Sequence, residues 1–497
     1  MKKLAAIFLC FVFVFPLSAG CARDQGSDTP ADTTTSDLLD TSASDETSAE
    51  TELVEDDLGD DIDFGGESAG ILYWSDVQNA EFEVKEISGD LIGDAIYARN
   101  QAIEERLGVE LKWVGVSGNY ENQAGFVSAA NNDVLAGGMS YDIFAGYSMT
   151  AATLALRGCT QNLLVLDYLN FEKPWWPDSL INQSTISDKL YFCSGDISCN
   201  LLYMMYTVYF NKDLVTEYNL ENPYELVYDN RWTVDKLIEL STDLYRDLNG
   251  NGVADQGDRF GLVTRAIFYD SFFWGSGLTE IEKDASGNLV ISENWDSEKT
   301  LYLLEKLCPF FHESGDTFTA TDGAGLYNIF GSGNSLFALT EAQYSIKGFA
   351  ASGVNYGVVP VPKYDSEQKN HVTILSFPYT MYSISFATQK ANMASAVLEC
   401  YASESYRKVT PAVFEISFKY KYSSGSDDVV MWDIVRESVS FELGRIFTTS
   451  LNNLSYSLFR NAVINNAAAS WTTNFKVNRR VLEKLIENIQ GTMDSLG

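Results

Sequence analysis

The sequence predicts an α/β fold with more than one domain, built on parallel sheets covered by helices. The chain has 497 residues, of which 45% are apolar and 13% aromatic, enough for a large buried core. Its first folded stretch reads as an apolar strand at 71–74, a helix whose apolar face recurs from Ile92 to Leu107, and an alternating strand at 109–114. Gly108 supplies a left-handed helix stop. Two strands joined by a helix in this way pair in parallel.

Residues 1–21 have the layout of an export signal. Two lysines precede an almost unbroken apolar run at 4–17, which is shorter than the ~20 apolar residues that a permanent membrane helix needs. The run leads into Ser-Ala-Gly-Cys, which resembles a bacterial lipobox, with Ser18 where leucine is usual. We therefore expect Cys21 to become a diacylated N-terminus that anchors an exported protein. The alternative is a simple signal peptide cleaved near Ala19.

Residues 22–68 form an acidic segment with sixteen acidic residues and one basic residue, a formal charge of −15. This composition cannot bury enough apolar surface to offset the entropy of ordering, so it predicts a disordered tether. A flexible chain of about 45 residues reaches roughly 35–40 Å. The whole chain carries −35, and a field of that sign repels nucleic acid and anionic lipid headgroups. Contact with a membrane is therefore expected only through the acyl chains.

Strand and helix patterns continue beyond the first unit. The continuous apolar-aromatic run at 203–210 indicates a strand buried on both faces, and Thr233 indicates a helix N-cap. The further predicted elements are a strand at 141–146, a helix at 151–156, a helix from Thr233 through Leu244, a strand at 354–362 stopped by two prolines, and a C-terminal helix after Asn474 with Val477, Val481, Leu485 and Ile489 on one side.

Cysteine usage argues against a disulfide framework, because an odd number of thiols remains after export and lipidation. Cys193 and Cys199 could close a small loop, and free buried thiols are equally compatible with their spacing. A zinc site is not expected, because His312 and His371 lie far from any close cysteine pair. The five remaining cysteines are Cys159, Cys193, Cys199, Cys308 and Cys400.

Several stretches occur in a particular order. They are the lipobox-like signal end, Tyr141–Phe144, Lys189–Tyr191, Val208–Leu214, Trp232-Thr233, Asp258–Gly261, Phe330–Leu339 and Asn355–Pro360. In this order they resemble the extracellular solute-binding proteins of ATP-binding-cassette importers, in the sugar-type family that includes maltose-binding protein. The resemblance covers residues 69 to about 390, and the last hundred residues match only in being helical.

The resemblance implies a two-lobed, periplasmic-binding-protein-like α/β fold with the solute held in the cleft between the lobes. Residues 69–196 and 336–385 would form the first lobe, and residues 197–335 and 386–497 the second. The implied function is delivery of a carbohydrate, a mono- or oligosaccharide, to an importer permease at the extracellular face of the cytoplasmic membrane. An extracellular carbohydrate-active enzyme and a surface adhesin are the alternatives.

Catalytic motifs are absent from the sequence. It contains no Gly-x-Ser-x-Gly elbow and no P-loop, and neither histidine has an evident nucleophile partner. Gly331-Ser332-Gly333 lacks the third glycine of a dinucleotide site. Paired carboxylates for a glycosidase are available anywhere in so acidic a chain. We therefore expect a protein that is not an enzyme.

Aromatic residues at strand ends are candidates for sugar binding, because sugars stack their apolar CH faces on aromatic rings and place their hydroxyls at the rim. The family uses strand-end residues that face the cleft. Large aromatics are mostly core residues, which is the alternative for each of them. Glu341, at a returning strand, is either a hydroxyl acceptor or a solvated loop acid. The candidates are Trp74, Tyr147, Ser148, Trp176, Tyr269, Trp274 and Glu341.

The loop at 247–258 has the spacing of an EF-hand calcium loop. Oxygen side chains stand at positions one, three, five, nine and twelve, and Gly252 stands at position six. Position twelve is Asp258, where a longer glutamate is usual. We expect one structural calcium ion, with a simple polar turn as the alternative. The predicted ligands are Asp247, Asn249, Asn251, Val253 through its carbonyl, Asp255 and Asp258.

Overall fold

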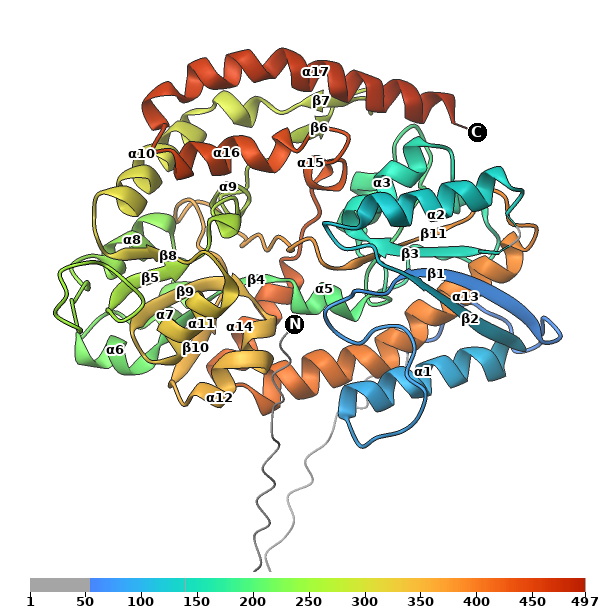
Figure 1. Ribbon diagram of the computed structural model, residues 1–497, viewed down its shortest axis with the longest axis horizontal. Helices are drawn as coiled ribbons and strands as arrows, with labels where there is room; N and C mark the ends of the chain where they lie inside the picture. The colour runs from blue at the N-terminus through green and yellow to red at the C-terminus, as the bar shows by residue number, and fades with distance from the viewer. Residues whose placement is uncertain (1–53, 139, 497) are drawn as a thin grey trace, which may run out of the picture. The chain divides into compact units, whose positions relative to one another are not determined.

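The computed structural model describes residues 54–138 and 140–496 (Figure 1). The export signal, Cys21 and the acidic segment up to residue 53 lie outside these described residues. Two main sheets and one small hairpin carry the strands of the described part. Within the same ranges, no helix is long and apolar enough to cross a membrane.

The first lobe is built on a four-stranded sheet in the order β11-β3-β1-β2. Strands β1, β2 and β3 are parallel, and β11 pairs antiparallel to β3 at the edge. Figure 1 shows α1 and α13 below this sheet and α2 and α3 above it. Its elements are β1 (Glu67–Trp74), α1 (Leu91–Leu107), β2 (Val109–Val116), α2 (Gln123–Leu135), β3 (Ile143–Tyr147), α3 (Ser148–Leu156), η1 (Leu163–Val165), α4 (Asp178–Ser184), β11 (Thr380–Ile384) and α13 (Ala391–Glu404).

The predicted strand-helix-strand unit is present at the start of this lobe. The Asp90 carboxylate accepts a hydrogen bond from the Gly93 N–H at 2.7 Å and caps the N-terminus of α1. Gly108 ends the helix with a left-handed φ of 58°, as its place after Leu107 predicted. The chain then enters β2, which runs parallel to β1 from Val109 onward.

The second lobe is built on a five-stranded sheet in the order β10-β4-β9-β5-β8. Strand β5 is parallel to β8 and β9, whereas β4 is antiparallel to β9 and β10. Its elements are β4 (Tyr206–Asn211), α6 (Lys212–Glu217), α7 (Pro223–Tyr228), α8 (Val234–Ser241), β5 (Phe260–Thr264), η2 (Ala266–Phe268), α9 (Ser271–Gly275), η3 (Glu293–Asp296), α10 (Glu298–His312), β8 (Thr317–Thr319), α11 (Gly323–Gly331), β9 (Ser335–Glu341), η4 (Ser345–Phe349), α12 (Ala350–Ser352) and β10 (Tyr356–Val359).

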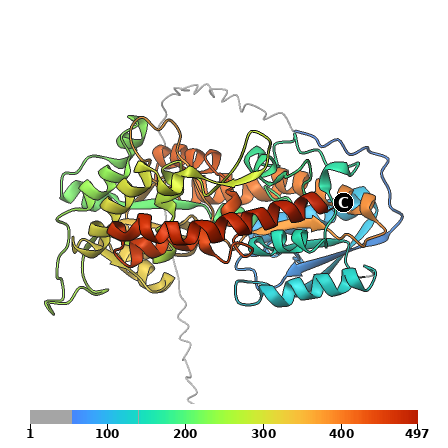
Figure 2. The same cartoon turned by 90° about the horizontal axis from the view of Figure 1, so that it is seen from above.

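The remaining elements connect the lobes or extend the second one. A continuous helical run leaves the first lobe as α13 and continues as two π-helical segments, η5 and η6. Val397 of this run packs in the first-lobe core, whereas Val413 and Phe418 pack in the larger second core. Figure 2 shows the long α17 extending from the second-lobe helices to the first lobe. These elements are α5 (Cys199–Tyr203), β6 (Ile281–Lys283), β7 (Leu289–Ile291), η5 (Ser405–Val409), η6 (Pro411–Lys421), α14 (Ser426–Glu437), α15 (Leu443–Ile446), α16 (Leu454–Ile464), η7 (Ala468–Ser470) and α17 (Trp471–Ser495).

The lobe boundaries differ from those that the resemblance implied. Residues 336–385 were expected in the first lobe, but β9 and β10 pair with β4 in the second-lobe sheet, and only β11 returns to the first. Residues 386–497 were expected in the second lobe, yet α13 packs on α1 and contributes Val397 and Leu398 to the first-lobe core. The crossing points therefore lie after β10 and after α13.

The expected disordered tether also ends earlier than residue 68. Asp56 is buried, and its carboxylate accepts hydrogen bonds from Arg106 at 2.6 and 2.7 Å and from Arg407 at 3.1 Å. The neighbouring Leu58 is buried in the first-lobe core. One carboxylate paired with two arginines thus fixes a segment whose composition alone predicts disorder.

Two helix predictions need correction. The helix capped by Thr233 ends at Ser241 instead of Leu244, because the N–H groups of residues 243–245 turn away to the Asp316 carboxylate. In α17, Val477 is 71% exposed, so the predicted apolar face is wrong there and at the exposed Val481. The buried face is instead Trp471, Phe475, Leu482, Ile486, Ile489 and Met493.

The buried strand predicted at 203–210 begins later, because the chain up to Tyr203 is the short helix α5 and β4 starts at Tyr206. The five cysteines of the described part are all free and buried. Cys193 and Cys199 therefore do not close a loop. Burial raises the pKa of both thiols, which keeps them protonated and unreactive.

Candidate functional site

A cavity of about 570 Å³ lies where the carboxyl ends of strands from both lobes meet the crossing segment after β10. From the first lobe, side chains reach it from the loops after β1 and β2 and from the end of β3. The second lobe contributes the ends of β5 and β9, the start of β4 and the helices α11 and α16. The lining residues are Gln78, Tyr120, Tyr147, Tyr206, Arg265, Ile267, Gly323, Glu341, Gln343, Tyr344, Ser376, Phe377, Pro378, Tyr456 and Arg460.

The position of the cavity follows from the strand topology. Tyr147 is the last residue of β3, Glu341 is the last residue of β9, and Arg265 directly follows β5. Parallel strands place their carboxyl ends at one edge, where loops diverge and leave a crevice. Because each lobe turns such an edge toward the crossing segment at Ser376–Pro378, the two crevices form one cavity.

Aromatic rings form much of the cavity wall. Tyr147 packs edge-on against Trp74, with ring centroids 5.3 Å apart, and Tyr206 packs edge-on against Phe268 at 5.1 Å. Burial raises the pKa of Tyr206 to about 12, so its hydroxyl stays neutral and can donate a hydrogen bond to a ligand. Rings with such polar tips offer both a stacking face and a hydrogen-bonding group.

A buried ion-pair cluster stands behind the second-lobe side of the cavity. The Asp270 carboxylate accepts from Arg460 at 2.5 Å and from Arg445 at 3.3 Å, and it is 1% exposed. The Arg445 guanidinium lies 4.5 Å from the Trp274 ring centroid and 4.1 Å from that of Phe377. Arg460 lines the cavity itself, so the cluster holds one cationic side chain in position at the wall.

Two further charged residues line the cavity without pairing to each other. Burial raises the pKa of Glu341, although hydrogen bonds from Ser376 and Gln343 oppose that effect. Arg265 is partly buried, and its Nε is enclosed without a hydrogen-bond acceptor. No ion pair joins it to Glu341 or to any other acid in the described ranges.

The structure brings two of the predicted ligand residues, Tyr147 and Glu341, to the cavity. Trp74 lies directly behind Tyr147, is 1% exposed and donates its indole N–H to the Thr380 hydroxyl at 2.9 Å. Ser148 donates to the Phe377 carbonyl at 2.6 Å, which ties α3 to the crossing segment. Neither Trp74 nor Ser148 lines the cavity, because both are occupied in supporting its wall.

Trp176 lies in the first-lobe core instead of the cavity, where it and Trp175 donate their indole N–H groups to Glu399. Burial raises the pKa of Glu399 to about 7, against the effect of these bonds.

Tyr269 and Trp274 also lie outside the cavity, in the second core. The Tyr269 ring packs 4.2 Å from Phe311 and its hydroxyl contacts Thr319, whereas Trp274 packs against Arg445. Tyr269 and Trp274, like Trp176, follow the ordinary preference of large rings for the core.

Several cavity residues were not expected from the sequence. Arg265 stands immediately after the strand that begins near Phe260, so its strand-end position was a usable signal. Tyr456 and Arg460 are four residues apart on α16, with the guanidinium 4.4 Å from the ring centroid. Their spacing places them on one helix face, but nothing in the sequence locates that helix at the cavity.

The loop at 247–258 folds around its own oxygen-bearing side chains. Asp247 accepts hydrogen bonds from two backbone N–H groups at 2.7 and 2.9 Å. The side-chain oxygens of Asn249 and Asn251 each accept from the N–H two residues ahead. Their amide nitrogens donate to the two oxygens of Asp255 at 2.9 and 2.7 Å.

Asp258 closes this loop, because it is buried and accepts from the N–H groups of Leu248 and Asp255 at 3.1 Å. Val253 is 63% exposed, which suits a residue expected to act only through its carbonyl. The donor set consists of oxygens, which fits a hard cation. Across residues 54–138 and 140–496, however, no group of three or more His, Cys, Asp or Glu side chains is arranged to hold a metal ion.

Solved structures of solute-binding proteins share this fold. A cyclic α-maltosyl-1,6-maltose binding protein from Arthrobacter globiformis matches with a TM-score of 0.55 and 13% identity, covering 86% of this chain and 100% of that chain. An extracellular solute-binding protein from Staphylococcus aureus in complex with maltose matches with a TM-score of 0.54 and 14% identity, over 86% and 97%. A cyclo/maltodextrin-binding protein complexed with maltotetraose gives 0.54 and 13%, over 86% and 98%.

These matches confirm the predicted two-lobed α/β fold. At such identities the likeness is one of fold alone. No protein-family model matches the chain, and no curated protein sequence matches it.

Proposed function

We propose that the protein is a non-catalytic, extracellular solute-binding protein that delivers a carbohydrate to an ATP-binding-cassette importer. The observation that carries this proposal is the cavity of about 570 Å³ between the lobes, whose wall combines six aromatic rings with amides, hydroxyls and charged groups. Concave sites of this size with a few placed polar groups are typical of small-molecule binding. The similar structures contain maltose and maltotetraose, which supports a sugar as the ligand.

Binding would be coupled to movement of the lobes. The crossing segment at Ser376–Pro378 lines the cavity, and the helical run from α13 into η6 packs in both cores. Tyr120 comes from the first lobe and Tyr456 from the second. Burial and a hydrogen bond between the two hydroxyls raise the pKa of Tyr456. A sugar bound between such walls would be enclosed from both sides when the lobes close.

The test is a ligand screen combined with product analysis. Thermal shifts across a panel of mono- and oligosaccharides should identify at least one stabilising sugar, because a ligand that binds only the folded state stabilises it by mass action. Chromatography of the same mixtures should recover the sugar unchanged. Turnover of any sugar would replace this proposal with that of a carbohydrate-active enzyme.

Cys21 is proposed as the lipid anchor, on the strength of the lipobox-like sequence around it. Asp56 is fixed to the first lobe by ion pairs with Arg106 and Arg407. The acidic segment that precedes it would therefore serve as the link to the membrane. Replacement of Cys21 by alanine should move the protein from the membrane fraction to the medium. Unchanged fractionation would refute the anchor without affecting the proposed ligand.

The loop at 247–258 is proposed as a structural calcium site, which rests on its five oxygen side chains at EF-hand spacing. Asp247, Asn249, Asn251, the Val253 carbonyl, Asp255 and Asp258 would hold the ion. A chelator should lower the melting temperature of the wild type, and Asp247→Ala should abolish that difference. An unchanged melt together with no copurified calcium would leave the loop as a polar turn.

A further inference from the structure

Arg265 is a cationic residue of the cavity wall that makes no ion pair with another described residue. It follows the central strand β5, lines the cavity, and has an enclosed Nε with no acceptor. Within the described part of the chain its side chain makes no hydrogen bond and no ion pair. Arg460, the other arginine of the wall, differs because it pairs with Asp270 at 2.5 Å.

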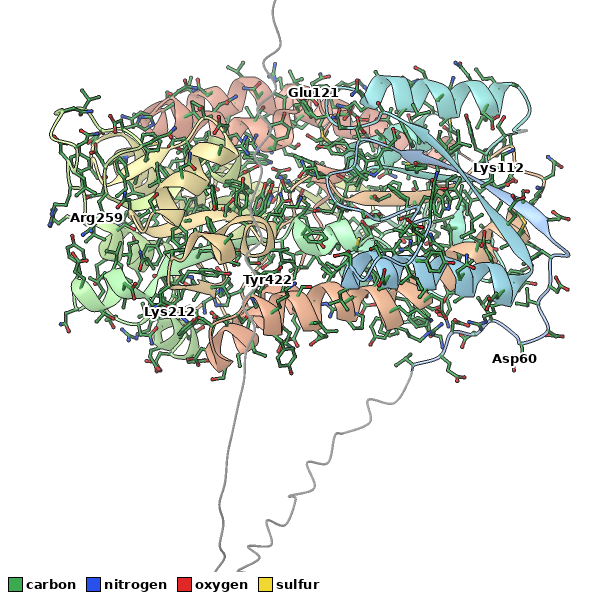
Figure 3. All side chains as sticks on the ribbon, turned by 60° about the horizontal axis from the view of Figure 1, so that its bottom comes forward. Asp60, Lys112, Glu121, Lys212, Arg259 and Tyr422 are labelled. Carbon is green, nitrogen blue, oxygen red and sulfur yellow. The ribbon has the colours of Figure 1, made fainter. Side chains whose placement is uncertain are left out.

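An enclosed guanidinium N–H without an acceptor is unfavourable, and more so than a neutral donor because it carries charge. Arg259 shows how the same lobe treats an arginine of similar burial away from the cavity. Its Nε is also enclosed without an acceptor, but its Nη1 pairs with Glu217 at 2.8 Å and donates to the Tyr218 hydroxyl. Figure 3 shows Arg259 at the outer end of the second lobe. Arg265 therefore differs from Arg259 in two respects: it lines the cavity, and it makes no ion pair with an acid of the described residues.

The acidic residues nearby do not supply that partner. Glu341 is the acidic residue among those lining the cavity. Burial raises its pKa, and this effect outweighs the hydrogen bonds from Ser376 and Gln343 and the charge of Arg265, with which it forms no ion pair. Asp322 accepts the Gly325 N–H as the cap of α11.

We infer that the solute is an anionic sugar whose acidic group is bound by Arg265, while the tyrosines of the wall contact the neutral faces of its rings. The charge would come from the carboxylate of a uronic acid or from a sulfate ester. A guanidinium donates two parallel hydrogen bonds to such a group, and these charge-assisted bonds are stronger and more directional than those of a lysine. This inference rests on the proposed carbohydrate-binding function and narrows its substrate class.

The experiment compares matched neutral and acidic sugars by titration calorimetry of the folded protein. The probes are trisaccharides of glucose, galactose and mannose, the corresponding trisaccharides of their uronic acids, and sulfated disaccharides. We expect at least one acidic sugar to bind about tenfold or more tightly than its neutral counterpart. A uronic acid as the tighter class identifies a carboxylate as the group, and a sulfated sugar identifies a sulfate ester.

Variants then test whether the preference for acidic sugars depends on the Arg265 side chain. Arg265→Gln should weaken the acidic sugar about tenfold or more and remove the preference over the neutral one, whereas Arg265→Lys should retain part of it. Arg259→Gln is the matched control and should leave both affinities unchanged. If Arg265→Gln does not fold, the lysine variant and the wild-type preference still decide the question.

The possible failures are distinguishable. If wild type binds neutral sugars as tightly as acidic ones, the inference is wrong and the carbohydrate-binding function stands. If the acidic preference survives in Arg265→Gln, the assignment to this arginine is wrong. If no sugar of any class binds, the proposed function and this inference both fail.

Discussion

A buried charge of the first lobe and the buried charges beside the cavity are satisfied to different degrees. In the first lobe the Asp56 carboxylate is bound by Arg106, Arg407 and the Ser403 hydroxyl. In the second lobe, two charged residues near the cavity each have a buried atom without a hydrogen-bond partner. Asp270 has one oxygen and Arg460 has its Nε without a partner.

This difference separates structural charge from charge that a ligand can use. A satisfied buried carboxylate fixes one arrangement of the chain, and nothing remains for a solute to bind. An unpaired donor or acceptor at a cavity destabilises the protein by its desolvation free energy until a ligand supplies the missing partner. We therefore expect substitution of Asp56 to change stability alone, and substitution of a charged residue at the cavity wall or directly behind it, such as Asp270, to change binding as well.

The largest effect is expected for Asp270→Asn. Removal of the carboxylate leaves Arg445 and Arg460 without their shared counter-charge, and breaking a buried pair in this way costs about 3–5 kcal/mol. Urea denaturation should record this loss, and ligand affinity should fall because Arg460 is no longer held. Asp235→Asn, which breaks an exposed pair with Lys306, is the control and should cost less than about 1 kcal/mol. Equal costs for the two variants would contradict the account.

Asp56→Asn should destabilise the first lobe without changing ligand affinity. Burial raises the pKa of Asp56, but hydrogen bonds from Arg106, Ser403 and Arg407 outweigh it and lower the pKa from 3.8 to about 2. That shift corresponds to about 2 kcal/mol of stability at neutral pH.

The sign of this contribution fixes its pH dependence. Because the folded-state pKa lies below the unfolded value, the contribution is fully present above about pH 4 and is lost as the pH falls toward 2. The stability gap between wild type and Asp56→Asn should therefore shrink over that range in urea melts. Asp57→Asn is the neighbouring control, since Asp57 is 61% exposed, and it should show almost no gap at any pH.

Tyr120→Ala tests the first-lobe side of the cavity itself. Tyr120 is 49% exposed, so its removal leaves no cavity in the core and stability should stay unchanged. Loss of one stacking ring should weaken neutral and acidic sugars alike, by about 1 kcal/mol or roughly fivefold. Tyr420→Ala, a 73% exposed tyrosine outside the cavity, should change neither affinity. A selective loss of acidic sugars would contradict the role of Tyr120 as a stacking ring for neutral faces.

A small, pH-dependent effect on stability is expected for Glu341→Gln. Burial raises the pKa of this carboxyl, so its charged form is disfavoured in the folded state and stability declines as the pH rises from the unfolded value of about 4.5 through the raised one. The amide should remove this decline and stay within about 1 kcal/mol of wild type at pH 7. A cost of several kcal/mol would mean that the carboxylate carries an ion pair.

Much of the fold could be predicted from the sequence, because local signals specify it. The apolar period of α1 and the stop at Gly108 gave the first βαβ unit, and Thr233 gave the start of α8. The sequence predicts less well which lobe each strand belongs to. Lobe membership depends on which distant strands pair, and nothing in residues 335–341 distinguishes a strand of one sheet from a strand of the other.

The lining of the cavity could be predicted only in part, for a related reason. Tyr147 and Glu341 line it because they end strands, and Arg265 lies at a strand end too, but an aromatic pattern does not select an arginine. Trp176 and Trp274 look equally suitable in the sequence, yet partners far along the chain, Glu399 and Arg445, hold them in the core. Burial of a large ring is decided by tertiary packing, which spacing does not reveal.

The most direct test of the central claim is a crystal structure of the protein with its tightest-binding sugar. We expect the sugar between the two lobes, with a ring stacked on the tyrosines that include Tyr147 and an acidic group on the Arg265 guanidinium. A sugar bound instead in another depression, such as the cavity of about 370 Å³ beside Asp196 and Arg436, would contradict the account.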